Sequence, residues 1–487
     1  MKFKTFRYIW IFSLAALLMA ACSDDFVDVD SFDPDSESFF NSEQEYYDAL
    51  VAAYDLLQST YLNVMLGEIA SDNTLAGGES ATDVPGIQEV DDMIHTPVNQ
   101  QLRDIWSWMF AGVNRANYIL EFKDKTDFPG KETIIAEATF LRAYYYFELV
   151  KWFGDVPLAV DKRFLFGDQE VVERTPKAEV YAQIEADFIY AASVLDYTAP
   201  QTGRATKGAA QALLGKVYLY QNKFQESAAV LEDLINNGPY DLVADYSILF
   251  EQEGENSIES VFEVQYTDQQ GAGFGCLQCS EGNVAVGFNG PRTYNGPLFD
   301  SGFSFNVPVQ EAYDAYDADD IRKDLAILNI VQWAEETGAT YTEGFEHTGF
   351  FNRKYIPRQG DSNIGDKNLT NPNNYRSIRF ADVLLMAAEA LNRGGISDTR
   401  AQEYLNRVRN RAGLGDITET GNNLTEAIFQ ERRLELMGEG HRFFDLVRTG
   451  RAADNIDGFV SGKHELFPIP SIEIELAGNR WSQNPGY

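Results

Sequence analysis

Apolar side chains recur every three or four positions along most of the chain. Six such stripes lie at 136–150, 181–195, 210–217, 224–235, 384–391 and 401–412. Because an α-helix has 3.6 residues per turn, each stripe predicts one apolar face of an amphipathic helix. Short Gly- or Asn-containing turns join the later stripes into pairs. We therefore expect a mostly α-helical fold built from about four helix pairs.

The pair at 210–239 carries the spacing of a tetratricopeptide (TPR) unit. Its diagnostic positions are Leu214, Gly215, Tyr218, Leu231 and Pro239, with Ser227 where a small Ala is usual. A small residue lets two antiparallel helices approach, and an aromatic side chain fills the groove between them. Looser matches at 136–195 and 384–412 favour a helical-repeat platform, because several units are needed to bury a continuous core.

The helical pattern breaks between about 250 and 375. Residues 260–266 alternate like a short strand, and glycines and aromatic residues then intermix as far as Phe305. A second stretch, 359–375, is rich in Gly, Asn and Asp. These compositions are typical of loops, and long irregular loops in a compact protein usually carry function. We expect residues 251–375 to form a loop-rich ligand-binding region.

The N-terminus has the composition of an export leader. Lys2, Lys4 and Arg7 precede an apolar run of about a dozen residues, which is short for a membrane span. The run ends in small residues directly before Cys22, which resembles a bacterial lipobox. This pattern predicts a signal peptide at 1–21 and a lipid-bearing Cys22. An ordinary signal peptide or an uncleaved anchor are the alternatives.

The chain is strongly acidic, with 39 Lys and Arg against 75 Asp and Glu and a formal net charge of −36. No Lys or Arg lies between Cys22 and Leu102, so residues 22–40 are expected to form an acidic tether. Such a charge disfavours binding to nucleic acid. Three cysteines exclude a scaffold built from disulfides, and four histidines leave little room for a His-rich metal site.

Seven segments together resemble one known family. They are AEATFLRA (136–143), FGDVPL (153–158), YRSIRFADVLLMAAEALN (375–392), ERRLEL (431–436), EGHRFFDLVR (439–448), FPIP (467–470) and the closing QNPGY (483–487). Their order, with the lipobox, is similar to that of the SusD/RagB family of outer-membrane nutrient-uptake lipoproteins. The resemblance covers almost the whole chain after the leader.

The resemblance implies a fold, a location and a task. It implies a SusD-like fold with about four TPR-like helix pairs, an N-terminal helical part at 41–250 and a C-terminal part at 376–487. It also implies a lipoprotein on the cell surface, anchored in the outer membrane. There it would capture a nutrient, most often an oligosaccharide and sometimes a peptide, and deliver it to a SusC-like TonB-dependent transporter without catalysis.

Candidate ligand-binding residues lie in two loops, 72–100 and 266–305. Sugars present flat apolar faces ringed by hydroxyl groups, so aromatic side chains flanked by polar ones suit them. The candidates are Asp72, Asn73, His95, Tyr294, Asn295, Phe299 and Phe303. Neither loop contains Trp, unlike strongly glycan-binding members of the family, so a peptide ligand stays open. Trp106 and Trp108 fit the core side of a helix, whereas Trp333 stays open as a Trp that could face the ligand.

Charged residues near the C-terminus are nearly balanced. Residues 376–451 hold 12 Arg, no Lys and 11 Asp or Glu. Arg forms forked pairs with carboxylates that can be buried, so this cluster is interpreted as a structural ion-pair network. With so many acids in the chain, no single carboxylate pair identifies a glycoside hydrolase, which stays an alternative beside a protein-binding TPR scaffold.

Two further motifs have weak metal or redox signals. The acidic residues at 314–324 lack the Gly and the final Glu of an EF-hand, so calcium is only a secondary possibility and no cofactor is predicted. Cys276 and Cys279 form a lone CxxC in a Gly-rich loop, without the two further ligands that structural zinc needs. Either a local disulfide or two free thiols fits this pair.

Overall fold

The computed structural model describes residues 39–165, 167–168, 171–269, 273–360 and 365–487. The leader, Cys22 and most of the acidic tether lie outside the described residues, so the predicted lipidation at Cys22 stays a prediction. None of the described helices combines the length and the apolar composition that a bilayer crossing requires.

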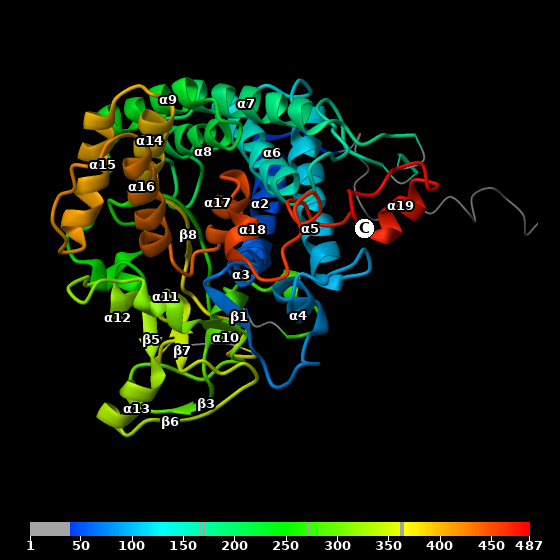
Figure 1. Ribbon diagram of the computed structural model, residues 1–487. Helices are drawn as coiled ribbons and strands as arrows, with labels where there is room; N and C mark the ends of the chain where they lie inside the picture. Colours follow the sequence, from blue (N-terminus) through cyan, green and yellow to red (C-terminus); the bar gives the residue numbers. More distant parts are fainter. Residues whose placement is uncertain (1–38, 166, 169–170, 270–272, 361–364) are drawn as a thin grey trace, which may run out of the picture.

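Eight long helices form a continuous arc across the upper part of the molecule (Figure 1). They are α5 (Gln100–Glu121), α6 (Lys131–Phe153), α7 (Lys177–Val194), α8 (Lys207–Tyr220), α9 (Phe224–Asn237), α14 (Phe380–Arg393), α15 (Asp398–Arg411) and α16 (Gly421–Glu435). Each of the first five packs on the next along the chain, and α14 packs on α9, α15 and α16. The six predicted stripes all lie in helices of this arc, which confirms the mostly helical fold.

The close approach of α8 and α9 depends on Gly215. A Cβ atom at Gly215 would lie 2.4 Å from Cδ2 of Leu231, so only glycine fits there without a shift. The buried hydroxyl of Ser227 donates to the carbonyl oxygen of Gly215 over 2.8 Å, which ties the two helices together. The predicted role of these TPR positions is therefore confirmed.

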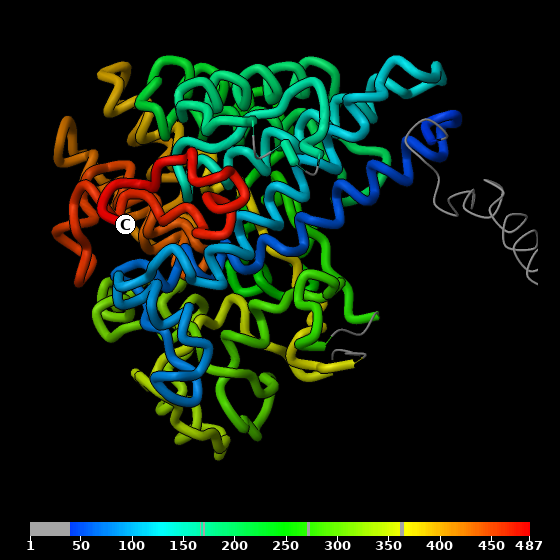
Figure 2. Tube along the Cα trace, turned by 90° about the vertical axis from the view of Figure 1, so that its right-hand side faces the viewer, coloured from blue at the N-terminus to red at the C-terminus, as the bar shows by residue number. Residues whose placement is uncertain are grey.

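Short elements fill the chain between α9 and α14. The strands are β2 (Ser260–Val264), β3 (Arg292–Asn295), β4 (Asn306–Pro308), β5 (Ile327–Asn329), β6 (Thr340–Thr342) and β7 (Phe350–Asn352). The helices are α10 (Val284–Asn289), α11 (Gln310–Asp314), α12 (Lys323–Ala326) and α13 (Ile330–Thr337). Most of these elements lie below the helical arc in both views (Figures 1 and 2).

The predicted strand at 260–266 is confirmed as β2, but its partner was not predicted. β2 pairs antiparallel with β8 (Tyr375–Arg379), which runs directly into α14. In the sequence, residues 375–379 stand out only as part of a family motif, because a five-residue strand that is buried on both faces shows no alternating pattern. The β2–β8 ladder joins the short-element region to the helical arc.

Most of the remaining elements pack inside and beneath the arc, and the last of them lies outside it, beside α5 (Figure 1). They are α2 (Glu43–Asp55), α3 (Tyr61–Ile69), β1 (Thr74–Ala76), α4 (Pro85–Asp91), α17 (Arg442–Arg448), α18 (Ala452–Asn455) and α19 (Ser471–Leu476). α2 packs on α5 and α6, and α3 packs on α17, so the two ends of the chain share one core.

A buried ion-pair network braces the C-terminal helices. Arg322, Arg379 and Arg411 all pair with Glu435, at 2.9, 2.8 and 2.6 Å, inside the protein. Glu439 accepts from both Arg379 and Lys354 at 2.7 Å. The structural interpretation of the Arg-rich cluster is confirmed, because every guanidinium here is occupied by carboxylates of the same chain.

Candidate functional site

The two loops proposed to bind ligand converge at the lower end of the molecule. β1 pairs antiparallel with β4, so Leu75 lies opposite Val307. Beyond β1, the backbone N–H groups of Gly77 and Gly78 donate to the carbonyl oxygens of Phe305 (3.0 Å) and Ser304 (2.7 Å). A Cβ atom at Gly77 would lie 2.0 Å from the Ser304 oxygen, so this approach requires glycine.

Phe274 and Phe303 form an accessible aromatic pair where these loops meet. Their ring centroids lie 5.7 Å apart in an edge-to-face arrangement, and Phe274 is 60% exposed. Phe303 also contacts the buried ring of Phe288 at 5.6 Å, and Phe288 contacts Phe305 at 5.2 Å. Four rings thus run from the core to the surface, and the outer two can offer apolar faces to a ligand.

A half-buried ion pair lies on the same group of loops. Nη2 of Arg292, on β3, donates to Oδ2 of Asp83 over 2.8 Å, and the backbone N–H of Glu79 donates to the same oxygen. The backbone N–H of Arg292 donates to Oγ of Ser304, next to Phe303. Both side chains remain partly exposed, so they can orient the hydroxyl groups of a bound molecule.

Asp91 anchors the base of this loop and has a shifted pKa. Its Oδ2 accepts the backbone N–H of Ala76 over 2.7 Å, at the end of β1. Burial raises the pKa of the Asp91 carboxyl to about 7, the Ala76 bond lowers it, and nearby Asp92 and Glu346 raise it further. The carboxyl is therefore partly protonated at neutral pH, and its hydrogen bond marks it as a structural anchor.

Tyr294 and Phe299 lie inside a small second core rather than at the surface. The Trp333 indole Nε1 donates to the Tyr294 hydroxyl over 2.8 Å, and that hydroxyl donates to the carbonyl oxygen of Pro297. The Phe299 ring is fully buried, 5.3 Å from the ring of Trp333. Asn295, by contrast, is exposed on β3, where it pairs with Thr340 of β6.

Asp72, Asn73 and His95 are also engaged in the interior. Asp72 forms a forked pair with Arg442, with both bonds 2.7 Å long, and Asn73 Oδ1 accepts from Arg433 over 2.8 Å. The buried His95 shares a hydrogen bond of 2.8 Å with the hydroxyl of Tyr487. Of the seven candidates, Asn295, Phe303 and the partly exposed Asp72 keep a surface that a ligand can reach, because long-range packing buries the other four.

The acidic cluster at 314–324 is divided among separate partners. Asp320 is buried against Arg322 at 2.7 Å, and Asp324 accepts from the hydroxyl of Tyr313. Within the described part of the chain, no group of three or more His, Cys, Asp or Glu is arranged to hold a metal ion. Cys276 and Cys279 form a disulfide two residues after Phe274, which decides between the two states left open for this pair.

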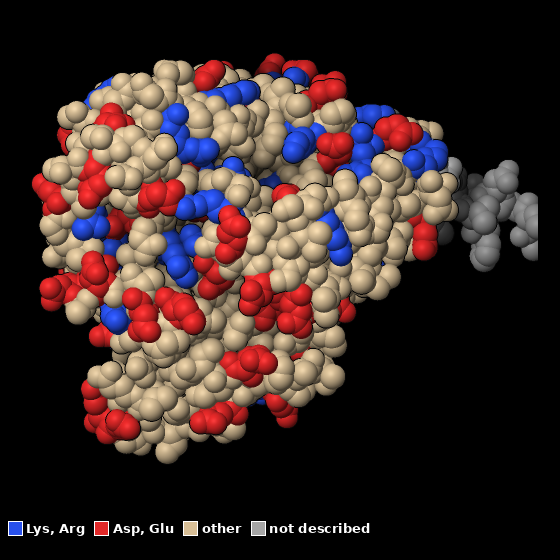
Figure 3. All heavy atoms as spheres, in the orientation of Figure 1, with Lys and Arg blue, Asp and Glu red and all other residues tan. Residues whose placement is uncertain are grey.

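The surface around the loops carries mainly acidic and uncharged groups. On the face shown in Figure 3, the lower part of the molecule has red and tan atoms and few blue ones, over the region that holds β3, β6 and α13 in Figure 1. A neutral ligand suits this surface better than an anionic one, because like charges repel.

Three residues of this site were absent from the predicted set: Phe274, Asp83 and Arg292. A signal for Phe274 was present, since an aromatic residue between glycines in a polar loop has few local packing partners. No local signal could pair Asp83 with Arg292, because 209 positions separate them.

Two family models match separate parts of the chain. The model described as the SusD family matches residues 328–487. The model described as starch-binding, associating with the outer membrane, matches residues 25–219. Together the two matches include most of the helical arc except α9, the C-terminal motifs and the first of the two converging loops.

Known relatives and solved structures agree with these matches. "SusD-like protein P2" of Formosa agariphila is 28% identical over 427 residues, which cover 82% of this chain and 83% of that protein. A solved laminarin-binding SusD-like protein is 38% identical, with a TM-score of 0.83, over 92% of this chain and 100% of that one. Surface glycan-binding protein A from Bacteroides thetaiotaomicron, solved with laminarihexaose, is 28% identical, with a TM-score of 0.82, over 91% of this chain and 99% of that one.

Proposed function

The chain belongs to the SusD family, and from this premise we propose that it is a surface glycan-binding protein that captures a laminarin-type oligosaccharide. The observation that carries the proposal is the 38% identity, over 92% of the chain, to a laminarin-binding relative. The accessible pair Phe274 and Phe303, beside Asp83 and Arg292, supplies the matching chemistry. Laminarihexaose is uncharged, which suits the acidic surface.

Binding would combine apolar and polar contacts. The faces of Phe274 and Phe303 cover the C–H face of a sugar ring, which removes apolar surface from water. Arg292 donates to sugar hydroxyls, the Asp83 carboxylate accepts from them, and the Asn295 amide can do either. Asp72, Asn73, Tyr294 and Phe299 act as positioning residues, since each one packs or pairs beneath the loops.

The protein is proposed to bind the glycan without hydrolysing it. The two carboxylates of a glycosidase flank the scissile bond about 5–10 Å apart. Among the described residues of the two loops, the carboxyl whose pKa is raised to about 7 is that of Asp91, and it accepts a hydrogen bond from the backbone of β1. The solved relatives named above are described as binders, which supports the same conclusion.

Isothermal titration calorimetry with laminarihexaose, other neutral oligosaccharides and peptides tests this proposal. We expect heat from laminarihexaose, and a loss of affinity in the double variant Phe274→Ala/Phe303→Ala. Reducing-sugar assays on the same samples should show no release. If the folded protein gives no binding heat with any glycan, glycan capture is refuted. If it releases reducing sugar, and substitution of one Asp or Glu abolishes that release, the alternative of a glycoside hydrolase is supported instead.

We further propose that the protein is anchored through lipid on Cys22, faces the cell exterior and hands its ligand to a SusC-like TonB-dependent transporter. The family model's description of association with the outer membrane supports the location. Labelling with a palmitate analogue, compared with a Cys22→Ala variant, tests the anchor. Purification of the protein from outer membranes tests its association with the transporter. If the protein is recovered without a large membrane protein, the proposed partnership is contradicted.

A further inference from the structure

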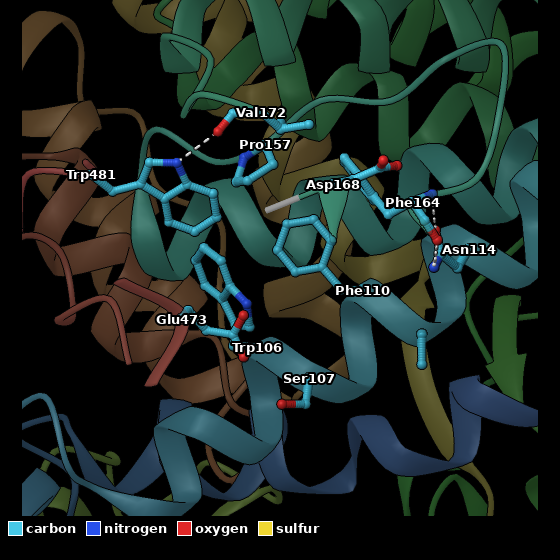
Figure 4. A pocket seen from close by; sticks show the side chains of 11 residues that line it. Trp106, Ser107, Phe110, Asn114, Pro157, Phe164, Asp168, Val172, Glu473 and Trp481 are labelled. Atoms are coloured by element: carbon cyan, nitrogen blue, oxygen red, sulfur yellow. Dashed lines mark hydrogen bonds between the residues drawn. The ribbon is translucent and has the colours of Figure 1, made fainter. Parts of the chain in front are cut away.

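A separate cavity of about 270 Å³ lies far from the loops, against the helical arc. Residues from three parts of the sequence line it: one face of α5, the residues Pro157, Phe164, Asp168 and Val172, and the C-terminal residues Glu473 and Trp481 (Figure 4). In Figure 1 these segments lie beside α5 and α19, whereas the loop site lies at the lower end of the molecule. The cavity is therefore distinct from the site proposed above.

Aromatic rings form one continuous wall of this cavity. Figure 4 shows the rings of Trp106, Phe110 and Trp481 turned toward a common space. The Trp106 ring lies 4.8 Å from Phe110 and 6.3 Å from Trp481, and Phe110 lies 5.8 Å from Phe164. The indoles are 3% and 6% exposed, so they form the floor, and the more open Phe110 forms the side.

Hydrogen bonds hold this wall in place. Nε1 of Trp481 donates to the carbonyl oxygen of Val172 over 2.8 Å. The amide of Asn114 donates to the carbonyl oxygen of Phe164 and accepts its backbone N–H, at 3.0 and 2.9 Å. The rings are thus fixed before any ligand arrives, which reduces the entropy lost on binding.

Two carboxylates and a hydroxyl group face the same cavity. Asp168 lines the cavity and accepts the backbone N–H of Leu165 through Oδ2. Glu473 lies beside Trp106 and is half-buried, and Ser107 is exposed at the rim (Figure 4). Burial raises the pKa of the Glu473 carboxyl, while Arg103 and Trp106 lower it.

This combination restricts the ligand class. An anion would be repelled by Asp168 and Glu473, and a purely apolar group would strip water from both carboxylates without replacing its hydrogen bonds. A sugar ring meets both requirements, because its C–H face covers aromatic rings and its hydroxyls donate to carboxylates. The volume is below the roughly 300–1,000 Å³ of pockets that enclose drug-sized ligands, which suits a single ring.

We propose that the cavity lined by Trp106, Phe110 and Trp481 is a second saccharide site that takes one sugar unit of the same glycan. This inference rests on the proposed function, since it assigns a further part of the chain to glycan capture. Two separated sites on one protein would hold a long polysaccharide more tightly than either alone, because the second contact becomes intramolecular. The site thus favours polymeric over short ligands.

Fluorine NMR of the protein labelled with 5-fluorotryptophan tests the proposal, with signals assigned from Trp→Phe variants. We expect laminarihexaose to move the signals of Trp106 and Trp481 and to leave that of the buried Trp152 in place. The same movement should persist in Phe274→Ala/Phe303→Ala, whose loop site is impaired. Ser107→Arg, which places a long side chain in the cavity from an exposed position, should weaken the response at least about tenfold.

Ser193→Arg is the matched control, because Ser193 is an exposed serine on α7 outside the cavity. If calorimetry shows that laminarihexaose binds while the fluorine chemical shifts of Trp106 and Trp481 do not change, the second site is overturned and the proposed function stays intact. The second site would also be overturned if laminarihexaose shifted the Trp106 and Trp481 signals equally in Ser107→Arg. The same holds if tetramethylammonium shifted these signals and the sugar did not. An absence of heat with every glycan would overturn both proposals.

Discussion

Arg379, the last residue of β8, donates from Nη1 to Oε1 of Glu435 over 2.8 Å, and both side chains are closed off from water. The two residues lie 56 positions apart. Their contact joins the β2–β8 ladder to the end of α16. The pair belongs to a network in which Glu435 also receives Arg322 and Arg411.

Breaking this network at Arg379 should be costly. Arg379→Ala removes the guanidinium that Glu435 and Glu439 share. Arg322, Arg411 and Lys354 remain in place, but one buried negative charge loses its compensation. We expect a loss of about 3–5 kcal/mol in the free energy of unfolding. Denaturant unfolding measures it. Arg400→Ala is the control, because the Arg400–Glu232 pair on the surface should contribute no more than about 1 kcal/mol. Equal losses in both variants would contradict the assigned role of burial.

The α8–α9 contact should be sensitive to one added side chain. Gly215→Val drives a Cβ atom against Leu231 and should cost about 1–3 kcal/mol of unfolding free energy. Combined with Leu231→Ala, the loss should be smaller than the sum of the two single losses, since the second change makes room for the first. Gly415→Val is the control, because no atom lies within 4 Å of a Cβ there.

Stability should fall in acid through the buried His95. Burial, and then His464, lowers the pKa of the folded-state imidazole to about 3, whereas an unfolded His titrates near 6.5. Below about pH 6.5, His95 binds a proton in the unfolded chain but not in the folded one. The contribution of neutral His95 to the free energy of unfolding is therefore fully present above that pH and is lost as the pH falls. From pH 7.5 to 5 this contribution is about 2 kcal/mol.

Comparison with His95→Phe isolates this effect. The variant keeps a ring against Phe467 but cannot be protonated, so its unfolding free energy should decline less over the same pH interval. Buried carboxylates such as Asp445 titrate in both proteins and cancel in the difference. Identical pH profiles for the two proteins would rule out the proposed contribution of His95.

Removing the outer aromatic ring of the loop site should weaken glycan binding without affecting the fold. Phe274→Ala should raise the Kd for laminarihexaose about tenfold, which corresponds to about 1.4 kcal/mol, and should change unfolding free energy by less than about 0.5 kcal/mol. Ile189→Ala, at a similarly exposed apolar residue on α7, is the control. If Phe274→Ala binds laminarihexaose with unchanged affinity, the glycan does not bind at the pair Phe274 and Phe303.

Local patterns were enough to predict six helices of the arc, α6 to α9, α14 and α15, and the strand β2. Helical spacing depends on residues three and four positions apart, so it can be read from a single window of sequence. The same holds for Gly215, whose small size suits a close helix pair, and for the Arg-rich cluster, whose near balance of charge indicates pairing. The family motifs added the overall fold, because their order runs through the whole chain.

The candidate site could be predicted only as a region. The loops around 72–100 and 266–305 do converge, but burial of Tyr294 and Phe299 depends on Trp333, and that of Asn73 on Arg433. A loop aromatic looks the same in sequence whether it faces the core, like Phe299, or water, like Phe274. The difference is made by distant segments that cover one ring and not the other.

Local patterns and family motifs were sufficient for the helical architecture, the acidic character, the predicted export leader and the family. The folded chain was needed to establish that β8 pairs with β2, that Asp72 contacts Arg442 across 370 positions, and that Trp106 and Trp481 line one cavity. The two groups of features differ in the sequence distance over which their interactions act. Helix formation depends on neighbours along the chain, whereas burial, ion pairing and cavity shape depend on contacts between segments that only the folded chain brings together.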